Sequence, residues 1–175
     1  ATGVEIAIMD MAATGQLQKT GDIGEIVIKG ENGMHGYNNN PEANAEAFVD
    51  GWFRTGDQGF LDAEGYLALT GRIKELINRG GEKISPLEID GILLKHPAVA
   101  EAVCFAVPDE KYGEVVHAAV VLKGDADQEN IRAYCREQMA GFKVPDVVYI
   151  ADSLPRTATG KIQRRHMVAA FAERK

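Results

Sequence analysis

The sequence is poor in cysteine and has no long apolar run, and each absence excludes a class of protein. Its two cysteines, Cys104 and Cys135, lie in apolar stretches, outside any Cys-x-x-Cys pair or cysteine–histidine cluster. A disulfide framework and a metal site are therefore not expected. No apolar run approaches the roughly 20 residues that a membrane-spanning helix needs, and no signal peptide opens the sequence. We expect a cytoplasmic protein with reduced thiols and no membrane span.

Positive charge is also scarce. The 175 residues include 19 Lys and Arg against 26 Asp and Glu, for a formal net charge of −7. Such a surface repels a phosphate backbone, so a nucleic-acid partner is not expected, even for the segment KIQRR. The exception is the basic tail, residues 156–175. Its basic residues are Arg156, Lys161, Arg164, Arg165, Arg174 and Lys175, and its one acid is Glu173. The tail fits either a compact anionic ligand or a solvated helix face.

The first part of the sequence is rich in predicted strands. Apolar and polar residues alternate over 4–10 and over 24–30, which predicts two strands. Asn40 followed by Pro41 predicts the N-cap and first turn of a short helix. Residues 59–69 predict a β-hairpin, because a polar turn separates two apolar stretches.

The second part alternates helices and strands. Ser85, Pro86 and Glu88 predict a capping box at the start of a helix. Strands are expected at 102–107, 114–122 and 146–150, and further helices from Asp127 and around Met167, Val168 and Phe171. The fold class expected is therefore α+β.

These elements divide the sequence into two expected domains. Residues 1–71 contain too few elements for a complete domain, so they are expected to be the truncated, β-rich end of a larger one. Residues 72–175 have the size of a small α+β domain.

Three positions near the middle of the sequence are candidate ligand contacts. Asp57 follows Thr-Gly, and a carboxylate can accept hydrogen bonds from two neighbouring ribose hydroxyls. Arg72 offers a fork of donors for ribose or phosphate oxygens. The Gly80-Gly81 pair allows close backbone approach to a ligand. The alternatives are a turn aspartate, a surface arginine and a glycine turn.

Lys161 is the candidate near the end of the sequence. It follows Thr157, Thr159 and Gly160 in a polar segment, RTATGKIQRR. A phosphate-binding P-loop is excluded, because Pro155 occupies the position where that motif needs glycine. An ammonium on such a loop can meet negative charge that develops in a reaction. The alternative is an ordinary solvated lysine.

The order of these motifs resembles a known family. The segments FRTGD, GRIKELINRGGEKISPLEID and LPRTATGKIQRR follow one another as in the AMP-forming acyl-CoA synthetases of the adenylate-forming superfamily. The segments GYNNNPEAN and VPDEKYGE are similar to the oxalate-activating branch. The resemblance implies an acid–thiol ligase that uses ATP, Mg²⁺ and coenzyme A. The acid attacks the α-phosphorus of ATP, and the coenzyme A thiol then displaces AMP from the acyl-adenylate.

The resemblance also implies roles for individual residues. Lys161 matches the lysine that bridges the carboxylate and the α-phosphate. Asp57 and Arg72 match the pair that holds the ribose, and Lys74 occupies the hinge about which the small domain rotates. The stretch from Asn78 through Gly80, Gly81 and Glu82 would line the pantetheine passage, and Lys83 would approach the adenylate phosphate.

Other parts of the family pattern are absent from this sequence. The phosphate loop and the acid pocket belong to the large N-terminal domain, so the 175 residues are expected to be inactive alone. The acid is left open between oxalate, another short dicarboxylate and a medium-chain fatty acid. A thiol of a carrier protein could also replace coenzyme A. The alternative from another class is a stand-alone module that binds a nucleotide or a partner without turnover.

Overall fold

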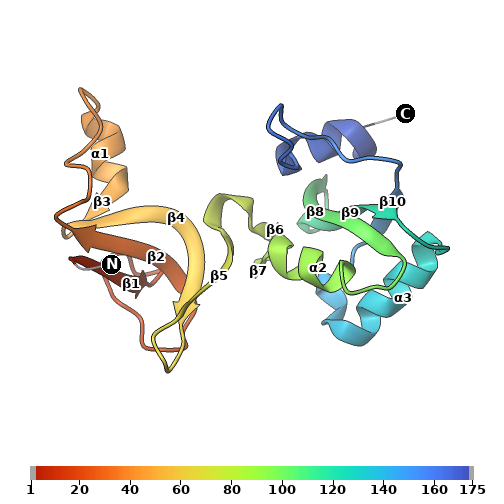
Figure 1. Ribbon diagram of the computed structural model, residues 1–175, viewed down its shortest axis with the longest axis horizontal. Coiled ribbons are helices and arrows are strands. Elements are labelled where there is room, and N and C mark those ends of the chain that lie inside the picture. Colours follow the sequence, from red (N-terminus) through yellow and green to blue (C-terminus); the bar gives the residue numbers. More distant parts are fainter. Residues whose placement is uncertain (1–2, 174–175) are drawn as a thin grey trace. The chain divides into compact units, whose positions relative to one another are not determined.

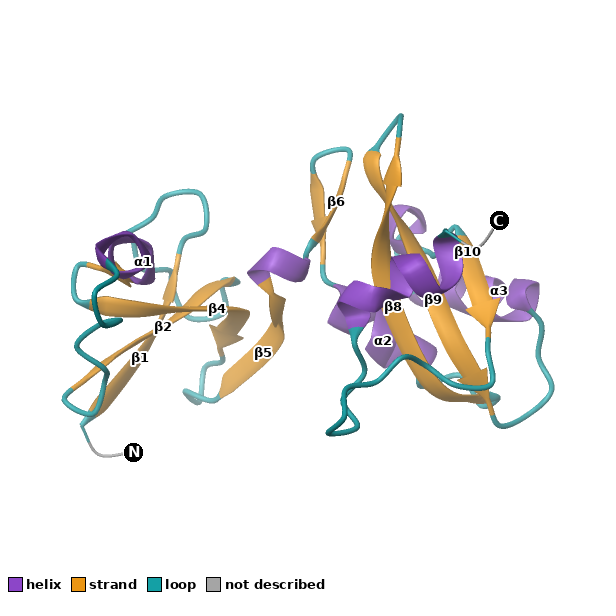
Figure 2. Ribbon diagram, turned by 90° about the horizontal axis from the view of Figure 1, so that it is seen from above, coloured by secondary structure: helices purple, strands orange, loops and turns teal. Residues whose placement is uncertain are grey.

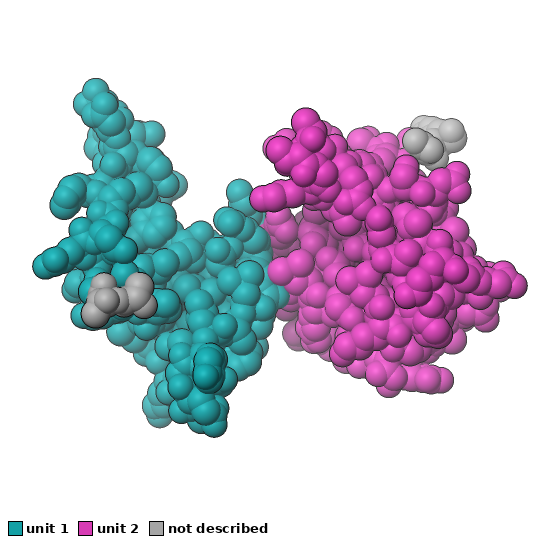
Figure 3. Space-filling model, viewed as in Figure 1, with its two compact units in different colours: residues 1–74 teal, residues 75–175 magenta. Residues whose placement is uncertain are grey.

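The computed structural model describes residues 3–173, and these form two compact units that divide between Lys74 and Glu75 (Figure 3). Within these residues, each unit contains its own five-stranded sheet, with one α-helix in the first unit and two in the second (Figure 1), so the fold class is α+β, as predicted. No helix within residues 3–173 is long and apolar enough to cross a membrane.

The first unit is an antiparallel sheet with one short helix. Its strands are β1 (Val4–Met9), β2 (Gly24–Gly30), β3 (Phe48–Val49), β4 (Trp52–Leu61) and β5 (Leu67–Arg72), and its helix is α1 (Pro41–Ala47). The strand order is β1-β2-β4-β3, and β5 also pairs with β4. Both strands predicted at the start of the sequence are present. They pair with Ile6 opposite Ile28, and Ile8, Ile26 and Val27 are buried.

The local signals for α1 and the hairpin are also confirmed. The Asn40 side chain accepts a hydrogen bond from the Ala43 amide at 3.1 Å, and Pro41 is the first helical residue. The turn between β4 and β5 is closed by Asp62, whose carboxylate accepts the Tyr66 amide at 2.7 Å. Both features depend on residues within four positions of each other, which is why the sequence revealed them.

The second unit is a mixed sheet with helices. Its strands are β6 (Ile77–Arg79), β7 (Glu82–Ile84), β8 (Val99–Asp109), β9 (Gly113–Leu122) and β10 (Val147–Ile150). Its α-helices are α2 (Pro86–Leu93) and α3 (Gln128–Gln138). The order is β10-β9-β6-β7, with β8 on β9, and β10 runs parallel to β9. Figure 2 shows the β6–β7 hairpin beside the long β8–β9 pair.

The second sheet has a hydrophobic core on each face. Alternate residues of β8 point to opposite sides, as the pleat of a strand requires. Cys104 packs in a cluster with Ile89 of α2 and Ile131 of α3. Phe105 packs in a second cluster with Met167 of the C-terminal segment. Figure 1 accordingly shows α2 and α3 on one side of this sheet and the C-terminal turns on the other.

One prediction for the second unit is wrong in detail. Ser85 is the N-cap of α2 but makes no side-chain capping hydrogen bond. Glu88 does not complete a capping box, because its carboxylate binds Lys143 Nζ at 2.7 and 2.8 Å. The expected final helix is present as a 3-10 helix (Arg164–His166) that continues into a π-helix (Val168–Ala172), and it packs on the sheet.

Candidate functional site

Asp57 and Arg72, which the sequence predicted to act together, are in contact. They stand directly opposite each other on β4 and β5 and form an ion pair, with Arg72 Nε 2.8 Å from Asp57 Oδ1. The side chain of Arg72 is 50% exposed and that of Asp57 is 23% exposed. The pair therefore retains polar atoms that face solvent, including acceptor capacity on the carboxylate.

A cavity of about 750 Å³ in the first unit is lined by Arg72 and by Thr55 and Gly56, the two residues before Asp57. Its lining includes Glu25, Arg54, Thr55, Arg72 and Lys74. Charged and hydroxyl groups of this kind suit a polar ligand rather than an apolar one.

Glu25 and Arg54 are residues of this site that the sequence analysis missed. Glu25 is only 3% exposed, and its Oε2 accepts a hydrogen bond from Arg54 Nε at 2.8 Å. Arg54 Nη2 lies 2.8 Å from the same oxygen, which completes an ion pair. Its Oε1 accepts the Gly56 amide at 3.1 Å, one residue before Asp57. The available signal was a carboxylate directly before the apolar run Ile-Val-Ile of the strand GEIVIKG, where a buried charge needs a partner.

Lys74 lies at the junction between the two units. It is the central residue of a 3-10 turn (Ile73–Glu75), and its side chain is exposed. The first unit ends at Lys74 and the second begins at Glu75. A single short turn thus connects the units, which is the position that a hinge would occupy.

The residues Gly80 and Gly81 form the turn of the β6–β7 hairpin. Their φ angles are +60° and +99°, a region that side chains rarely adopt. Gly80 donates its amide to the Tyr112 carbonyl at 2.8 Å, and Gly81 donates to Asn78 Oδ1 at 3.2 Å. The turn alone is a sufficient reason for both glycines. Glu82 and Lys83 follow them on β7 with exposed side chains.

Lys161 projects from a tight turn in the second unit. The Thr157 amide donates to the Lys161 carbonyl at 2.8 Å, and Thr157 Oγ1 accepts the Lys161 amide at 3.0 Å. Gly160 has a φ of +83°, and its carbonyl accepts Arg156 Nη1 at 2.8 Å. These bonds hold the backbone while the lysine side chain is exposed. The threonines and glycine around Lys161 therefore build its turn.

The predicted residues fall into separate groups. Asp57, Arg72 and Lys74 belong to the first unit, whereas the hairpin from Asn78 to Lys83 and the turn of Lys161 belong to the second. Arg174 and Lys175 of the basic tail lie outside the described residues. Within residues 3–173, no group of three or more His, Cys, Asp or Glu side chains is arranged to hold a metal ion.

Comparison with known proteins agrees with the motif order. Residues 88–161 match the family model for the C-terminal domain of AMP-binding enzymes. A probable CoA ligase of Humulus lupulus, CCL9, is 54% identical over 171 residues, which is 97% of this chain and 32% of the relative. An oxalate–CoA ligase of Saccharomyces cerevisiae is 53% identical over 175 residues, covering 98% of this chain and 32% of the relative. The chain thus spans about a third of the length of these curated relatives.

Solved structures give the same result at lower sequence identity. ATP-bound MatB from Rhodopseudomonas palustris is 34% identical, with a TM-score of 0.90 over 98% of this chain and 34% of that chain. The o-succinylbenzoate CoA synthetase MenE from Bacillus subtilis, in complex with an acyl-adenylate intermediate, is 40% identical. Its TM-score is 0.84 over 95% of this chain and 34% of that chain. MenE has also been solved with ATP and a magnesium ion.

Proposed function

We propose that this chain, which belongs to the AMP-forming acyl-CoA ligases as a C-terminal portion, takes part in a ligation that proceeds in two steps. In the first step the whole enzyme joins a carboxylic acid to the AMP part of ATP and releases pyrophosphate. In the second step the thiol of coenzyme A attacks the acyl carbon, and AMP leaves. The acyl-CoA thioester is the product.

The contact between Asp57 and Arg72 is the observation that carries this proposal. It places a carboxylate and a guanidinium together, and Arg72 also lines a cavity of about 750 Å³. Two neighbouring ribose hydroxyls can donate to one carboxylate, and Arg72 can bind the same sugar or a phosphate oxygen. We assign the pair to the ribose of ATP. Relatives solved with ATP and with an acyl-adenylate support this assignment.

Lys161 would act in the first step. As the carboxylate oxygen bonds to the α-phosphorus and the bond to pyrophosphate breaks, negative charge builds on the oxygens around phosphorus. An exposed ammonium on a stiff turn can be brought to that charge and stabilise the transition state more than the ground state. Mg²⁺ would enter as part of the Mg-ATP substrate complex, in keeping with a relative solved with ATP and a magnesium ion.

The second step would use the hinge and the hairpin. A change of backbone torsions at Lys74 would move the second unit, so that the turn carrying Lys161 leaves and the hairpin of Gly80, Gly81, Glu82 and Lys83 arrives. The short turn that joins the units supports this role. The hairpin would then line the passage for the pantetheine arm of coenzyme A.

We propose oxalate or another short dicarboxylate as the acid. The support is the identity of about half of the residues with an oxalate–CoA ligase. The test uses a ligase of full family length whose C-terminal third is this chain. It is incubated with ATP, coenzyme A and a panel of dicarboxylates and fatty acids, and AMP release is measured. Turnover of fatty acids without turnover of oxalate would contradict the substrate assignment.

The role of Lys161 has its own test in the same ligase. Lys161→Gln should lower the rate of acyl-adenylate formation by about 10²- to 10³-fold, the usual loss for one electrostatic contact in a transition state. Lys123→Gln is the matched control, because Lys123 is exposed in the same unit. Equal rates of pyrophosphate release in the two variants would contradict the proposal.

A further inference from the structure

The site in the first unit depends on an irregularity in its sheet. Along the β2–β4 pair, Glu25 stands opposite Gln58 and Val27 stands opposite Arg54. Between these pairs, the single residue Ile26 faces the segment 55–57 on β4. This segment, Thr-Gly-Asp, is a β-bulge, and bulges often change the direction of a functional side chain. Asp57 is the last residue of the bulge and stands opposite Arg72 on the other neighbouring strand.

Two side chains bind the backbone donors of the bulge. Glu25 Oε1 accepts the Gly56 amide at 3.1 Å, and Thr55 Oγ1 accepts the Asp57 amide at 3.0 Å. The same threonine hydroxyl donates to the Ile26 carbonyl at 2.7 Å. The hydroxyl therefore ties the bulge to β2 while it holds the amide of Asp57.

Gly56 allows the chain to turn within the bulge. Its φ is +71°, and a Cβ at this position would meet no atom within 4 Å. The backbone conformation, not a shortage of space, is therefore what requires glycine here.

The carboxylate of Glu25 is an unusual anchor for a strand. Glu25 is 3% exposed, and a charge at such a depth is strongly unfavourable unless it is compensated. The compensation comes from Arg54, which contacts Oε2 with two nitrogens at 2.8 Å each. One oxygen is thus neutralised by Arg54 while the other holds the Gly56 amide. Both residues also line the 750 Å³ cavity with Arg72.

We propose that Glu25 and Thr55 are positioning residues for the reaction, because together they hold the bulge that aims Asp57 at the ribose of ATP. This inference rests on the proposed function. Glu25 acts in it through the amide of Gly56, and Thr55 acts through the amide of Asp57. Loss of either side chain would leave an amide of the bulge without its partner, and Asp57 would lose its fixed direction beside Arg72.

The experiment compares ATP with 2′,3′-dideoxy-ATP, which lacks both hydroxyls that Asp57 would bind. The measured quantity is the ratio of kcat/KM for the two nucleotides, in a ligase of full family length that carries this chain. The parent should prefer ATP by roughly 10- to 100-fold, the range for a hydrogen bond to a charged group. Asp57→Asn should remove most of this preference. Glu25→Gln should reduce the ratio by about 10-fold, in the same direction as Asp57→Asn.

Thr55 provides a matched pair of variants that avoids a buried charge. Thr55→Val removes the hydroxyl at nearly constant volume and should lower the ratio of kcat/KM for ATP to kcat/KM for the dideoxy nucleotide. Thr55→Ser keeps the hydroxyl and should restore the ratio of the parent. Glu64→Gln is the control for Glu25→Gln, because Glu64 is exposed in the β4–β5 turn and should not change the ratio. If Glu25→Gln fails to fold, the Thr55 pair still tests the proposal.

The outcomes separate this inference from the proposed function. One outcome is that Asp57→Asn lowers the ATP preference while Glu25→Gln and Thr55→Val leave it unchanged. That outcome would overturn the positioning role alone. If Glu25→Gln and Thr55→Val lower kcat/KM equally for both nucleotides, the positioning role is also overturned, because such a loss indicates a purely structural role. An unchanged ratio in Asp57→Asn would overturn the ribose assignment, and the positioning role with it. A lower ATP preference in Asp57→Asn, Glu25→Gln and Thr55→Val, with the parent's preference restored in Thr55→Ser, supports the ribose assignment and the positioning role.

Discussion

Arg164 and Asp90 form an ion pair that joins the C-terminal segment to α2 across 74 residues of sequence. Arg164 Nη2 lies 2.8 Å from Asp90 Oδ2, and the two side chains are 16% and 13% exposed. Arg164 also donates to the Cys104 carbonyl and, at 3.1 Å, to Glu75 Oε2. Asp90 Oδ1 accepts the Cys104 amide at 2.6 Å. The pair therefore satisfies backbone groups of β8 and links the segment after Lys161 to the residue after Lys74.

Removal of Arg164 should destabilise the second unit. In Arg164→Met, Asp90 would be left as a buried carboxylate without its cation, and broken buried pairs cost about 3 kcal/mol or more. We expect a loss of this size in the free energy of unfolding of the 175-residue chain, measured by urea denaturation. Arg165→Met is the control, because the neighbouring Arg165 is exposed and should change stability by less than about 0.5 kcal/mol. Equal free energies of unfolding for Arg164→Met and Arg165→Met would contradict a stabilising role of the Arg164–Asp90 pair.

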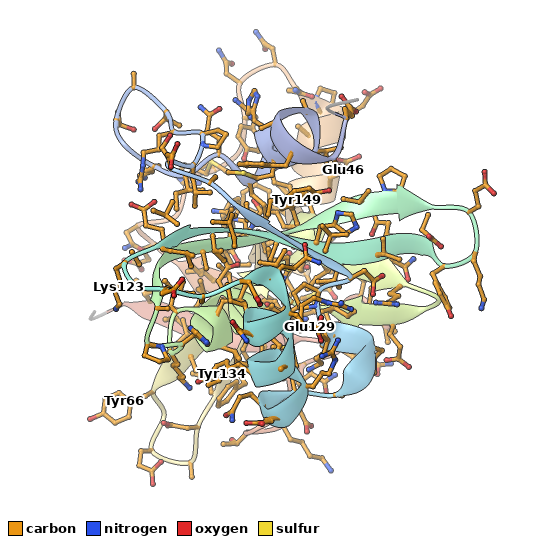
Figure 4. The ribbon with its side chains drawn as sticks, turned by 90° about the vertical axis from the view of Figure 1, so that its right-hand side faces the viewer. Glu46, Tyr66, Lys123, Glu129, Tyr134 and Tyr149 are labelled. Carbon is orange, nitrogen blue, oxygen red and sulfur yellow. The ribbon has the colours of Figure 1, made fainter. Side chains whose placement is uncertain are left out.

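The stability of the second unit should fall in mild acid because of His117. Burial lowers the pKa of His117 below its ordinary value of 6.5, against a smaller opposite effect of Asp146. Its Nδ1 lies 3.2 Å from the Tyr149 hydroxyl, and Tyr149, labelled in Figure 4, stacks on Phe171 at 5.6 Å between ring centroids. Because the folded state disfavours the protonated ring, neutral His117 contributes fully to the free energy of unfolding above pH 6.5. That contribution is lost as the pH falls through the lowered pKa.

The measurement is the free energy of unfolding between pH 7 and pH 5. The parent should lose stability over this range, and His117→Gln should lose distinctly less. His35→Gln is the control, since His35 is exposed in the first unit, and its profile should follow the parent. Parallel profiles for the parent and His117→Gln would refute the assignment to this ring.

Both cysteines should be unreactive in the folded chain. Cys104 and Cys135 are buried and free, and burial raises the pKa of Cys104 and brings that of Cys135 to about 11. The thiolate that reacts with disulfide reagents is therefore scarce at pH 8. An aromatic disulfide reagent should label both thiols only as fast as the chain unfolds, and both at once in denaturant. Rapid labelling of the native chain would contradict this burial.

The 175-residue chain by itself should form no acyl-CoA. It spans about a third of its curated relatives, and the family's phosphate loop and acid pocket were expected outside it. Incubation with ATP, coenzyme A and oxalate should release no AMP above the background without protein. Titration calorimetry with ATP tests the alternative of a binding module. Tight nucleotide binding by the chain alone, without turnover, would favour that alternative.

Much of the fold could be predicted because its signals are local. Asn40 with Pro41 starts α1, and Asp127 starts α3, where it accepts the Asn130 amide at 2.8 Å. Alternation of apolar residues located β1 and β2, and stretches rich in β-branched residues located β8 and β9. The family of the chain also followed from motif order alone.

The capping box of α2 was predicted wrongly, and the type of the final helix was not predicted, because distant contacts act on both segments. Glu88 binds Lys143, 55 residues away, instead of the start of its own helix. The C-terminal turns follow the surface of the second sheet, where Met167 and Phe171 pack beside Phe105. Local propensity is weak compared with such tertiary contacts.

The sequence by itself determined the class of the fold, most strands and helices, and the motifs that carry Asp57, Arg72 and Lys161. Each of these depends on residues close together in the chain. Only the tertiary structure decided that Asp57 contacts Arg72, that buried Glu25 anchors the bulge beside them, and that Arg164 joins Asp90. Those contacts link strands and segments whose register is set by packing of the whole unit. A carboxylate in an apolar strand shows that a partner is needed, but not which residue provides it.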